Sequence, residues 1–412
     1  MTWAIYTCHS QPTQEMTQDY PRLESLDSLK SLLLFLVVSF NTMPLHYSNQ
    51  IFAKYAQPDI TSFFYVLSGF VSMYNRTDGS HFSNFTQIKH YWYRKFLQIY
   101  PLYILSYLDT VLQTYSTTKK TEITYICTTL DAFMLGPVFY CPGLTQESQS
   151  HIWHLTVLAW IWALFPVIYP KMHTFFRATT YIWAKIALFW VIANAGFFIK
   201  YLYPRLTALD KTPYTRVWEF LMGAAVAYTL EKPVSPWLVA LTAIIIIAFY
   251  VASCFFLTNF PLLCDPDVFL RCVSVSIVDF WAKGAIFWAV LIHFTACDNR
   301  KPEHARFLTG LYYRFFTDLN YFSLQLYVLH KPFWQFIDFV VDKLFVITWM
   351  CPPLLEIACV YWTCYLFRAH IQKTLIKLLD AMCCCMLTPV IIVQDQQLPS
   401  LDSSNDTLEM AV

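Results

Sequence analysis

Charged residues are scarce in this chain. Only 13% of its 412 residues are charged, against about 25% in soluble domains. The 28 basic and 27 acidic side chains nearly cancel, which excludes a nucleic-acid partner, because a protein that binds a polyanion is strongly basic. The sequence also lacks an internal repeat of fixed period, and its 13 cysteines do not have the spacing of a small disulfide-bonded domain.

Apolar residues are abundant instead and make up 57% of the chain. A soluble protein of this length could not bury so much apolar surface, so we predict an all-α fold, a polytopic membrane helix bundle. About 20 mainly apolar residues cross the hydrocarbon core of a bilayer. The ten predicted spans are 29–47, 60–75, 96–114, 153–170, 180–199, 216–230, 236–257, 276–296, 319–340 and 344–367. An eleventh apolar stretch, 122–140, is interrupted by Asp131 and by Gly136-Pro137, which predicts a short or re-entrant segment.

The two ends of the chain are polar. Residues 1–28 hold no early apolar core, so we expect a cytosolic N-terminal segment without a secretory signal. Residues 368–412 are predicted to form a cytosolic, largely disordered tail. Ten spans put both termini on one side, and the cytosolic choice gives 16 Lys and Arg in inner segments against 8 in outer loops. A glycan on any of the sequons at Asn75, Asn84 and Asn405 would contradict this orientation.

Two groups of cysteines stand apart from those inside apolar segments. Cys264 and Cys272 share a predicted outer loop and could form a disulfide if that loop faces an oxidising lumen. A triplet after the last span is typical of juxtamembrane palmitoylation, with unmodified interfacial thiols as the alternative. It favours a eukaryotic endomembrane or plasma membrane over a bacterial one. The triplet is Cys383, Cys384 and Cys385.

The first apolar segment contains two polar residues whose burial in a membrane costs free energy. Lys30 lies near its start and Asn41 lies deep inside it. They are eleven positions apart, about three helical turns, and therefore share nearly the same face. A charge or an amide in a membrane helix is a functional candidate because its desolvation is expensive.

Six motifs, in the order of the chain, resemble those of the acyltransferase-3 family of integral-membrane O-acyltransferases. Each motif is apolar and weakly specific by itself, but together they cover residues 20–335. The resemblance implies that residues 29–367 form one transmembrane domain of this kind. The motifs are Tyr20 to Met43 (with Leu26 to Lys30 and Phe40-Asn41), FFYVLSGFVS (Phe63 to Ser72), YRKFLQIYPLY (Tyr93 to Tyr103), HIWHLTVLAWIWALFP (His151 to Pro166), RVWEFLMGAAVAY (Arg216 to Tyr228) and NYFSLQLYVLHKP (Asn320 to Pro332).

The resemblance implies transfer of an acyl group, usually acetyl, from cytosolic acyl-CoA to a hydroxyl of a sugar, lipid or related acceptor. The resemblance implies that acyl-CoA is a co-substrate and that membrane lipids surround the protein. It implies no metal. Lys89, Arg94 and Lys95 would hold the phosphates of CoA, unless they are an ordinary positive-inside cluster. The motif residues expected to position the co-substrate are His151, Trp153 and Arg216.

The sequence departs from the family at its catalytic residues. Asn41 stands where the family has its catalytic His, and Lys30 stands in place of the Arg partner. An amide does not titrate near neutral pH and cannot act as a general base, which typically contributes about 10²- to 10⁴-fold in rate. Lys also lacks the bidentate geometry of Arg. Other departures are Ser62 for an Asp, Gln98 for an Arg, and Leu158-Ala159 for a Val-Glu pair.

Three residues are candidates for a relocated proton acceptor. His330 belongs to the last motif, and His154 stands where the family has Ser. Glu219 is the third, although it lies three residues after Arg216 and could simply form an ion pair with it. The sequence is therefore compatible with an active acyltransferase and with an inactive homologue that binds lipid, acyl-CoA or a partner. A transporter is less well supported, because no inverted repeat is present.

Overall fold

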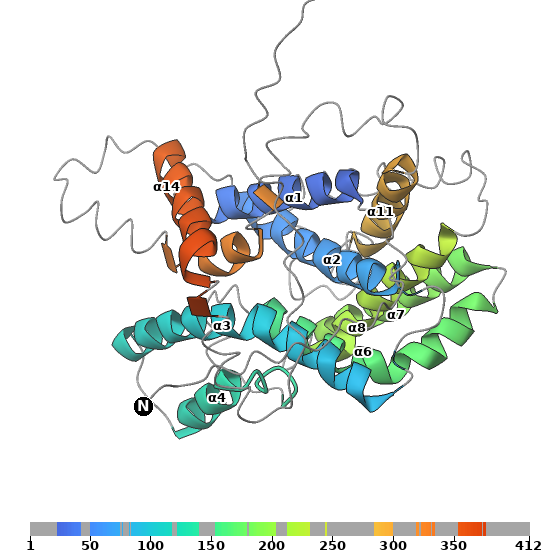
Figure 1. Ribbon diagram of the computed structural model, residues 1–412, viewed down its shortest axis with the longest axis horizontal. Helices are drawn as coiled ribbons and strands as arrows, with labels where there is room; N and C mark the ends of the chain where they lie inside the picture. The colour runs from blue at the N-terminus through green and yellow to red at the C-terminus, as the bar shows by residue number, and fades with distance from the viewer. Residues whose placement is uncertain are drawn as a thin grey trace, which may run out of the picture.

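The computed structural model describes residues 23–42, 50–74, 76, 82, 84–117, 122–139, 153–178, 181–202, 212–230, 244, 284–299, 319–320, 323–330, 332–333, 353–372 and 374–375. Within these ranges the secondary structure is helical and contains no strand, which confirms the predicted all-α class (Figure 1). The elements are α1 (Glu24–Thr42), α2 (Gln50–Tyr74), α3 (Phe85–Thr117), α4 (Glu122–Ala132), α6 (Trp153–Arg177), α7 (Ile182–Leu202), α8 (Pro213–Thr229), α11 (Ala285–Asn299), α14 (Pro353–Leu366) and the π-helix η6 (Phe367–Gln372).

Most predicted spans coincide with helices, but the number of membrane crossings remains a prediction. In the described part of the chain, α6 is the one helix long and apolar enough to cross a membrane. Two shorter apolar helices cover 182–195 and 285–297. The predicted span 236–257, apart from residue 244, lies outside the described residues, and so do the loop with Cys264 and Cys272 and the cysteine triplet.

Four of the described helices pack around helix α8. It contacts α2, α6, α7 and α11, and only the side chain of Tyr214 is strongly exposed along it. A large aromatic and aliphatic cluster joins these helices. A second cluster joins α1, α3, α14 and the short helical segment 323–330. Figure 1 shows α1 between α14 and α11, with α3 and α4 on the other side of the bundle.

Two glycines allow the backbones of α2 and α8 to touch. A Cβ atom on Gly69 would lie 1.9 Å from the carbonyl oxygen of Phe220, and one on Gly223 would lie 1.7 Å from that of Val66. Each glycine thus accommodates the backbone of the other helix. Small residues at helix crossings are typical of membrane proteins, where close van der Waals packing drives association. Gly69 belongs to the Ser-Gly-Phe sequence of α2 and Gly223 to the Met-Gly sequence of α8, and these two sequences form the contact.

We expect Gly223→Ala to destabilise the α2–α8 pair by about 1–3 kcal/mol, because the helices must separate to admit one methyl group. Thermal unfolding of the purified protein in detergent would measure the loss. Ala224→Gly on the same helix is the control for removing, instead of adding, a methyl group. An unchanged unfolding midpoint for Gly223→Ala would contradict the close contact.

Helix α4 is short, as predicted for the eleventh apolar stretch. Its 11 residues span about 16 Å, and the helix ends at Ala132, one residue after Asp131. Tyrosines on α3 hold it by donating hydrogen bonds to its carbonyl oxygens: Tyr103 to Asp131 at 2.5 Å and Tyr107 to Thr128 at 2.6 Å. Cys127 on α4 is disulfide-bonded, a bond that the sequence analysis did not predict.

Candidate functional site

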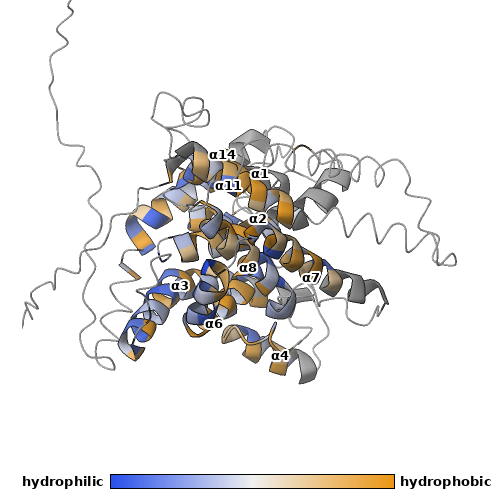
Figure 2. Cartoon of the chain, turned by 90° about the vertical axis from the view of Figure 1, so that its right-hand side faces the viewer, coloured by the Kyte–Doolittle hydropathy of each residue, from blue (hydrophilic) through white to orange (hydrophobic). Residues whose placement is uncertain are grey.

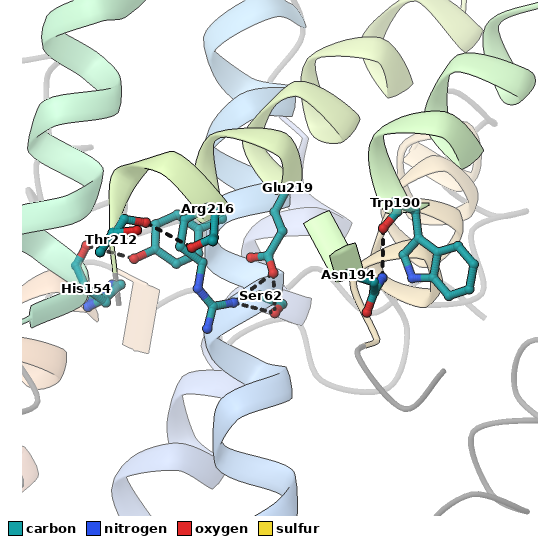
Figure 3. A network of polar contacts seen from close by, with 9 residues as sticks. Ser62, His154, Trp190, Asn194, Thr212, Arg216 and Glu219 are labelled. Carbon is teal, nitrogen blue, oxygen red and sulfur yellow. Dashed lines mark hydrogen bonds and ion pairs between the residues drawn. The ribbon is translucent and has the colours of Figure 1, made fainter. Parts of the chain in front are cut away.

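A buried ion pair lies at the N-terminal end of α8. Arg216 Nη1 is 2.7 Å from Glu219 Oε1, and the two side chains are only 2% and 1% exposed. Ser62 on α2 completes the group: its hydroxyl donates to Glu219 Oε1 at 3.1 Å and accepts from Arg216 Nη1 at 3.1 Å (Figure 3). Spacing of three on one helix brings the charges together. The pairing predicted from the sequence is therefore present, with Ser62 as a third member.

Aromatic rings cover the guanidinium of Arg216. The rings of Tyr65 on α2 and Trp153 on α6 both have their centroids 5.5 Å from its central carbon. Rings at this distance attract a cation through their negative faces, most strongly where water is excluded. The Tyr65 hydroxyl also donates to the backbone carbonyl of His154 at 3.2 Å. Segments from three separate motifs, at 63–72, 151–166 and 216–228, therefore meet around one charge.

The imidazole of His154 connects this group to the last motif. It is 3% exposed and packs edge-on against Tyr327, with ring centroids 4.2 Å apart. The Tyr327 ring lies 6.2 Å from that of His330, three residues further along the same short helix. Both candidate histidines thus lie next to one tyrosine. Sequence analysis missed Tyr327, although its i, i+3 spacing from His330 was a visible signal.

The hydrogen bonds of His330 indicate which of its nitrogens can accept a proton. Nδ1 lies 2.8 Å from the carbonyl oxygen of Tyr327 and 3.2 Å from that of Leu326. A carbonyl oxygen only accepts, so Nδ1 carries the hydrogen and Nε2 holds the lone pair of the neutral ring. An imidazole oriented in this way is suited to general-base chemistry. Glu219, by contrast, has its Oε1 engaged by both Arg216 and Ser62 and is suited to positioning.

A second cationic group lies near the start of α3. Lys95 is half-buried over the ring of Trp162 at 4.0 Å, and Lys95 and Arg76 both lie over the ring of Tyr91, at 5.9 and 5.6 Å from its centroid. Burial, and then the charge of Arg76, lower the pKa of Lys95 to about 8. Trp162 Nε1 donates to Ser68 Oγ at 2.7 Å, which holds the indole in place.

Two of the three residues predicted to bind the phosphates of CoA lie outside this group. Lys89 and Arg94 are exposed on α3, and Lys89 packs over Phe85 at 5.8 Å. Arg76 shares the Tyr91 ring with Lys95 and is held by a hydrogen bond from its Nη1 to the carbonyl oxygen of Ser72 at 2.7 Å. No signal in the sequence joins Arg76 to Lys95, because the two residues are 19 positions apart.

The structure describes few contacts of the residues of the first motif. Lys30 lies 4.0 Å from Asp27 one turn earlier on α1, with both side chains 27% exposed. Asn41 is in the last turn of α1, but its side chain and the whole of His151 lie outside the described residues. The described ranges contain no cluster of His, Cys, Asp or Glu that could hold a metal ion.

Comparisons with known protein families, with curated proteins and with solved structures found no match. Function must therefore be inferred from the side chains themselves. In the described residues these form a helical core with a buried, aromatic-covered charge pair, which is connected through His154 and Tyr327 to the oriented His330.

Proposed function

We propose that this protein is a multi-pass membrane acyltransferase that resembles the acyltransferase-3 family. It would move an acyl group, in the simplest case acetyl, from cytosolic acyl-CoA to a hydroxyl of a sugar, lipid or related acceptor. One observation carries the proposal. Four of the six sequence motifs converge on adjacent residues, namely Tyr65, His154, Arg216 and Tyr327. Unrelated apolar motifs would have no reason to share one buried polar centre.

The distribution of apolar side chains supports a membrane environment. Apolar residues occur along all labelled helices (Figure 2), and large ones remain exposed on outer helix faces, among them Leu112, Val167, Leu188 and Trp362. Helices that are apolar on all sides are typical of membrane spans. The disulfide at Cys127 fits the proposed orientation with both termini cytosolic, because it puts this cysteine on the non-cytosolic side, where disulfides persist.

In the proposed reaction, the acceptor hydroxyl attacks the carbonyl carbon of the thioester. Nε2 of His330 takes the hydroxyl proton, the bond from carbonyl carbon to sulfur breaks, and the CoA thiolate leaves with the proton. Arg216 and Glu219 act as positioning residues that hold α2, α6 and α8 together. Arg76 and Lys95 would bind the phosphates of CoA through charge-assisted hydrogen bonds.

A second candidate function has its own support. Asn41 cannot take a proton, and the charges of Arg216 and Glu219 largely cancel each other. An inactive homologue that binds acyl-CoA, lipid or a partner would keep these features, because they stabilise the fold without needing turnover.

Labelled acetyl-CoA and the purified full chain in detergent would test the proposed function. We expect acyl transfer or slow hydrolysis, and a gain of about 10-fold or more for Asn41→His, since a restored base contributes up to about 10⁴-fold. Lys95→Met should weaken binding of CoA, whereas the matched control Lys89→Met should not. Retained CoA binding without any turnover, in both the wild type and Asn41→His, would reject the enzyme and favour the inactive homologue.

A further inference from the structure

A cysteine, a histidine and a threonine meet where the C-terminal ends of α8 and α11 lie together. Nδ1 of His293 is 2.6 Å from the hydroxyl oxygen of Thr229. Nε2 of the same ring is 3.6 Å from the sulfur of Cys297, four residues later on α11. His293 is 5% exposed and Thr229 is 2% exposed, whereas Cys297 is half-buried and carries a free thiol.

The direction of the hydrogen bonds in this group is determined by the threonine. The Thr229 hydroxyl has one hydrogen, which it donates to the carbonyl oxygen of Val226 at 2.6 Å. Its oxygen therefore accepts from Nδ1–H of His293. That tautomer leaves the Nε2 lone pair facing the Cys297 sulfur. A thiol beside an oriented imidazole is the arrangement that activates cysteine nucleophiles.

The group is separate from the site described above. Thr229 lies thirteen residues after Arg216 on α8, about 20 Å along the helix. In the proposed orientation, the ends of α8 and α11 are on the cytosolic side. The ring of Trp183, at the start of α7, packs edge-on against the imidazole of His293, with centroids 5.4 Å apart.

An apolar stripe runs along α11 away from the thiol. Phe294, Leu291 and Phe287 precede Cys297 at spacings of three and four residues, so they share one side of the helix. All three are half-buried, while the residues between them are mostly buried. A long hydrocarbon chain attached to Cys297 could lie along this stripe.

We propose that Cys297 and His293 form a reactive pair that takes a long-chain acyl group from an acyl-CoA thioester. His293 Nε2 removes the thiol proton, and the thiolate attacks the carbonyl carbon of the thioester. A new carbon–sulfur bond forms to Cys297, the bond to the CoA sulfur breaks, and His293 returns the proton to the leaving thiolate. The products are S-acyl Cys297 and free CoA thiol. One thioester replaces another, so no oxidant or other reactant is needed.

This reaction does not depend on the proposed transfer to a hydroxyl acceptor, because it uses neither His330 nor the Arg216 group. Its test is incubation of the purified full chain with palmitoyl-CoA, followed by peptide mass spectrometry and by release with neutral hydroxylamine, which cleaves thioesters. We expect hydroxylamine-sensitive palmitoylation of Cys297 at least ten-fold faster than of Cys359, a half-buried free cysteine on α14 that serves as the internal control.

The variants separate a reactive pair from a merely accessible thiol. Cys297→Ser should abolish the label at this position, and His293→Gln should slow it about 100-fold through loss of the base. Thr229→Val removes the partner of Nδ1 and should slow labelling without removing His293, which provides a second variant if His293→Gln unfolds. Equal labelling of Cys297 and Cys359 would overturn the proposal. Equally fast labelling by acetyl-CoA would overturn its long-chain specificity.

Discussion

Replacing Glu219 by glutamine is expected to destabilise the protein by about 3–5 kcal/mol, the usual cost of leaving a buried charge without its partner. Arg216 is 2% exposed, so water cannot take over from the lost carboxylate. Thermal or denaturant unfolding of the purified protein in detergent would measure the change. The replacement should also lower the yield of monodisperse protein, because α2, α6 and α8 all meet at this charge.

The double variant Arg216→Met, Glu219→Met tests whether the loss of stability comes from the unpaired charge of Arg216. Removing both charges of a buried pair is often neutral or stabilising, so the double variant should recover most of the stability lost in Glu219→Gln. The half-exposed pair of Asp27 and Lys30 is the matched control. Asp27→Asn should change the stability by less than about 1 kcal/mol. Equal losses for Glu219→Gln and Asp27→Asn would show that the ion pair of α8 is not an important part of the core.

Replacing His330 by alanine is expected to lower acyl transfer by about 10²- to 10⁴-fold, the contribution of a general base. We favour this histidine over His154, because the carbonyl oxygens beside Nδ1 of His330 place the hydrogen on Nδ1 and the lone pair on Nε2. Single-turnover transfer from labelled acetyl-CoA would measure the loss. Binding of CoA should change little, since the cationic group at Lys95 belongs to other helices.

His154→Gln is the control, and it should lower transfer by less than about 10-fold if His154 only packs against Tyr327 and Trp153. A larger loss in His154→Gln than in His330→Ala would assign the base to His154.

The helices were predictable from the sequence, but not where they begin. A search for apolar segments finds the part of α3 from residue 96 onward, whereas the helix begins at Phe85. The first three turns of α3 carry polar residues, which are compatible with a helix but not with the apolar core of a membrane. The side chain of Asn84 accepts a hydrogen bond from the backbone N–H of Gln87 at 2.9 Å, a capping interaction that could have indicated the start.

The polar centre was predictable in part. The spacing of Arg216 and Glu219 suggested their ion pair, because both residues are on one helix. The role of Ser62 was not visible, since it contacts Glu219 across 157 positions of the chain. The choice between His154 and His330 also needed the structure. Hydrogen bonds to backbone carbonyls decide which nitrogen holds the proton, and residue types do not encode them. The interpretation of Asn41 as the position of a lost base stays a prediction.

The contact between Gly69 and Gly223 restricts how this protein can move. Each glycine receives a backbone carbonyl of the other helix at a distance where a methyl group would collide. Sliding α8 along α2 by even one residue would bring a side chain against that carbonyl, so the two helices must move as one rigid body. Any opening that admits an acceptor must then occur by displacement of other helices, such as α1 and α14, around this fixed pair.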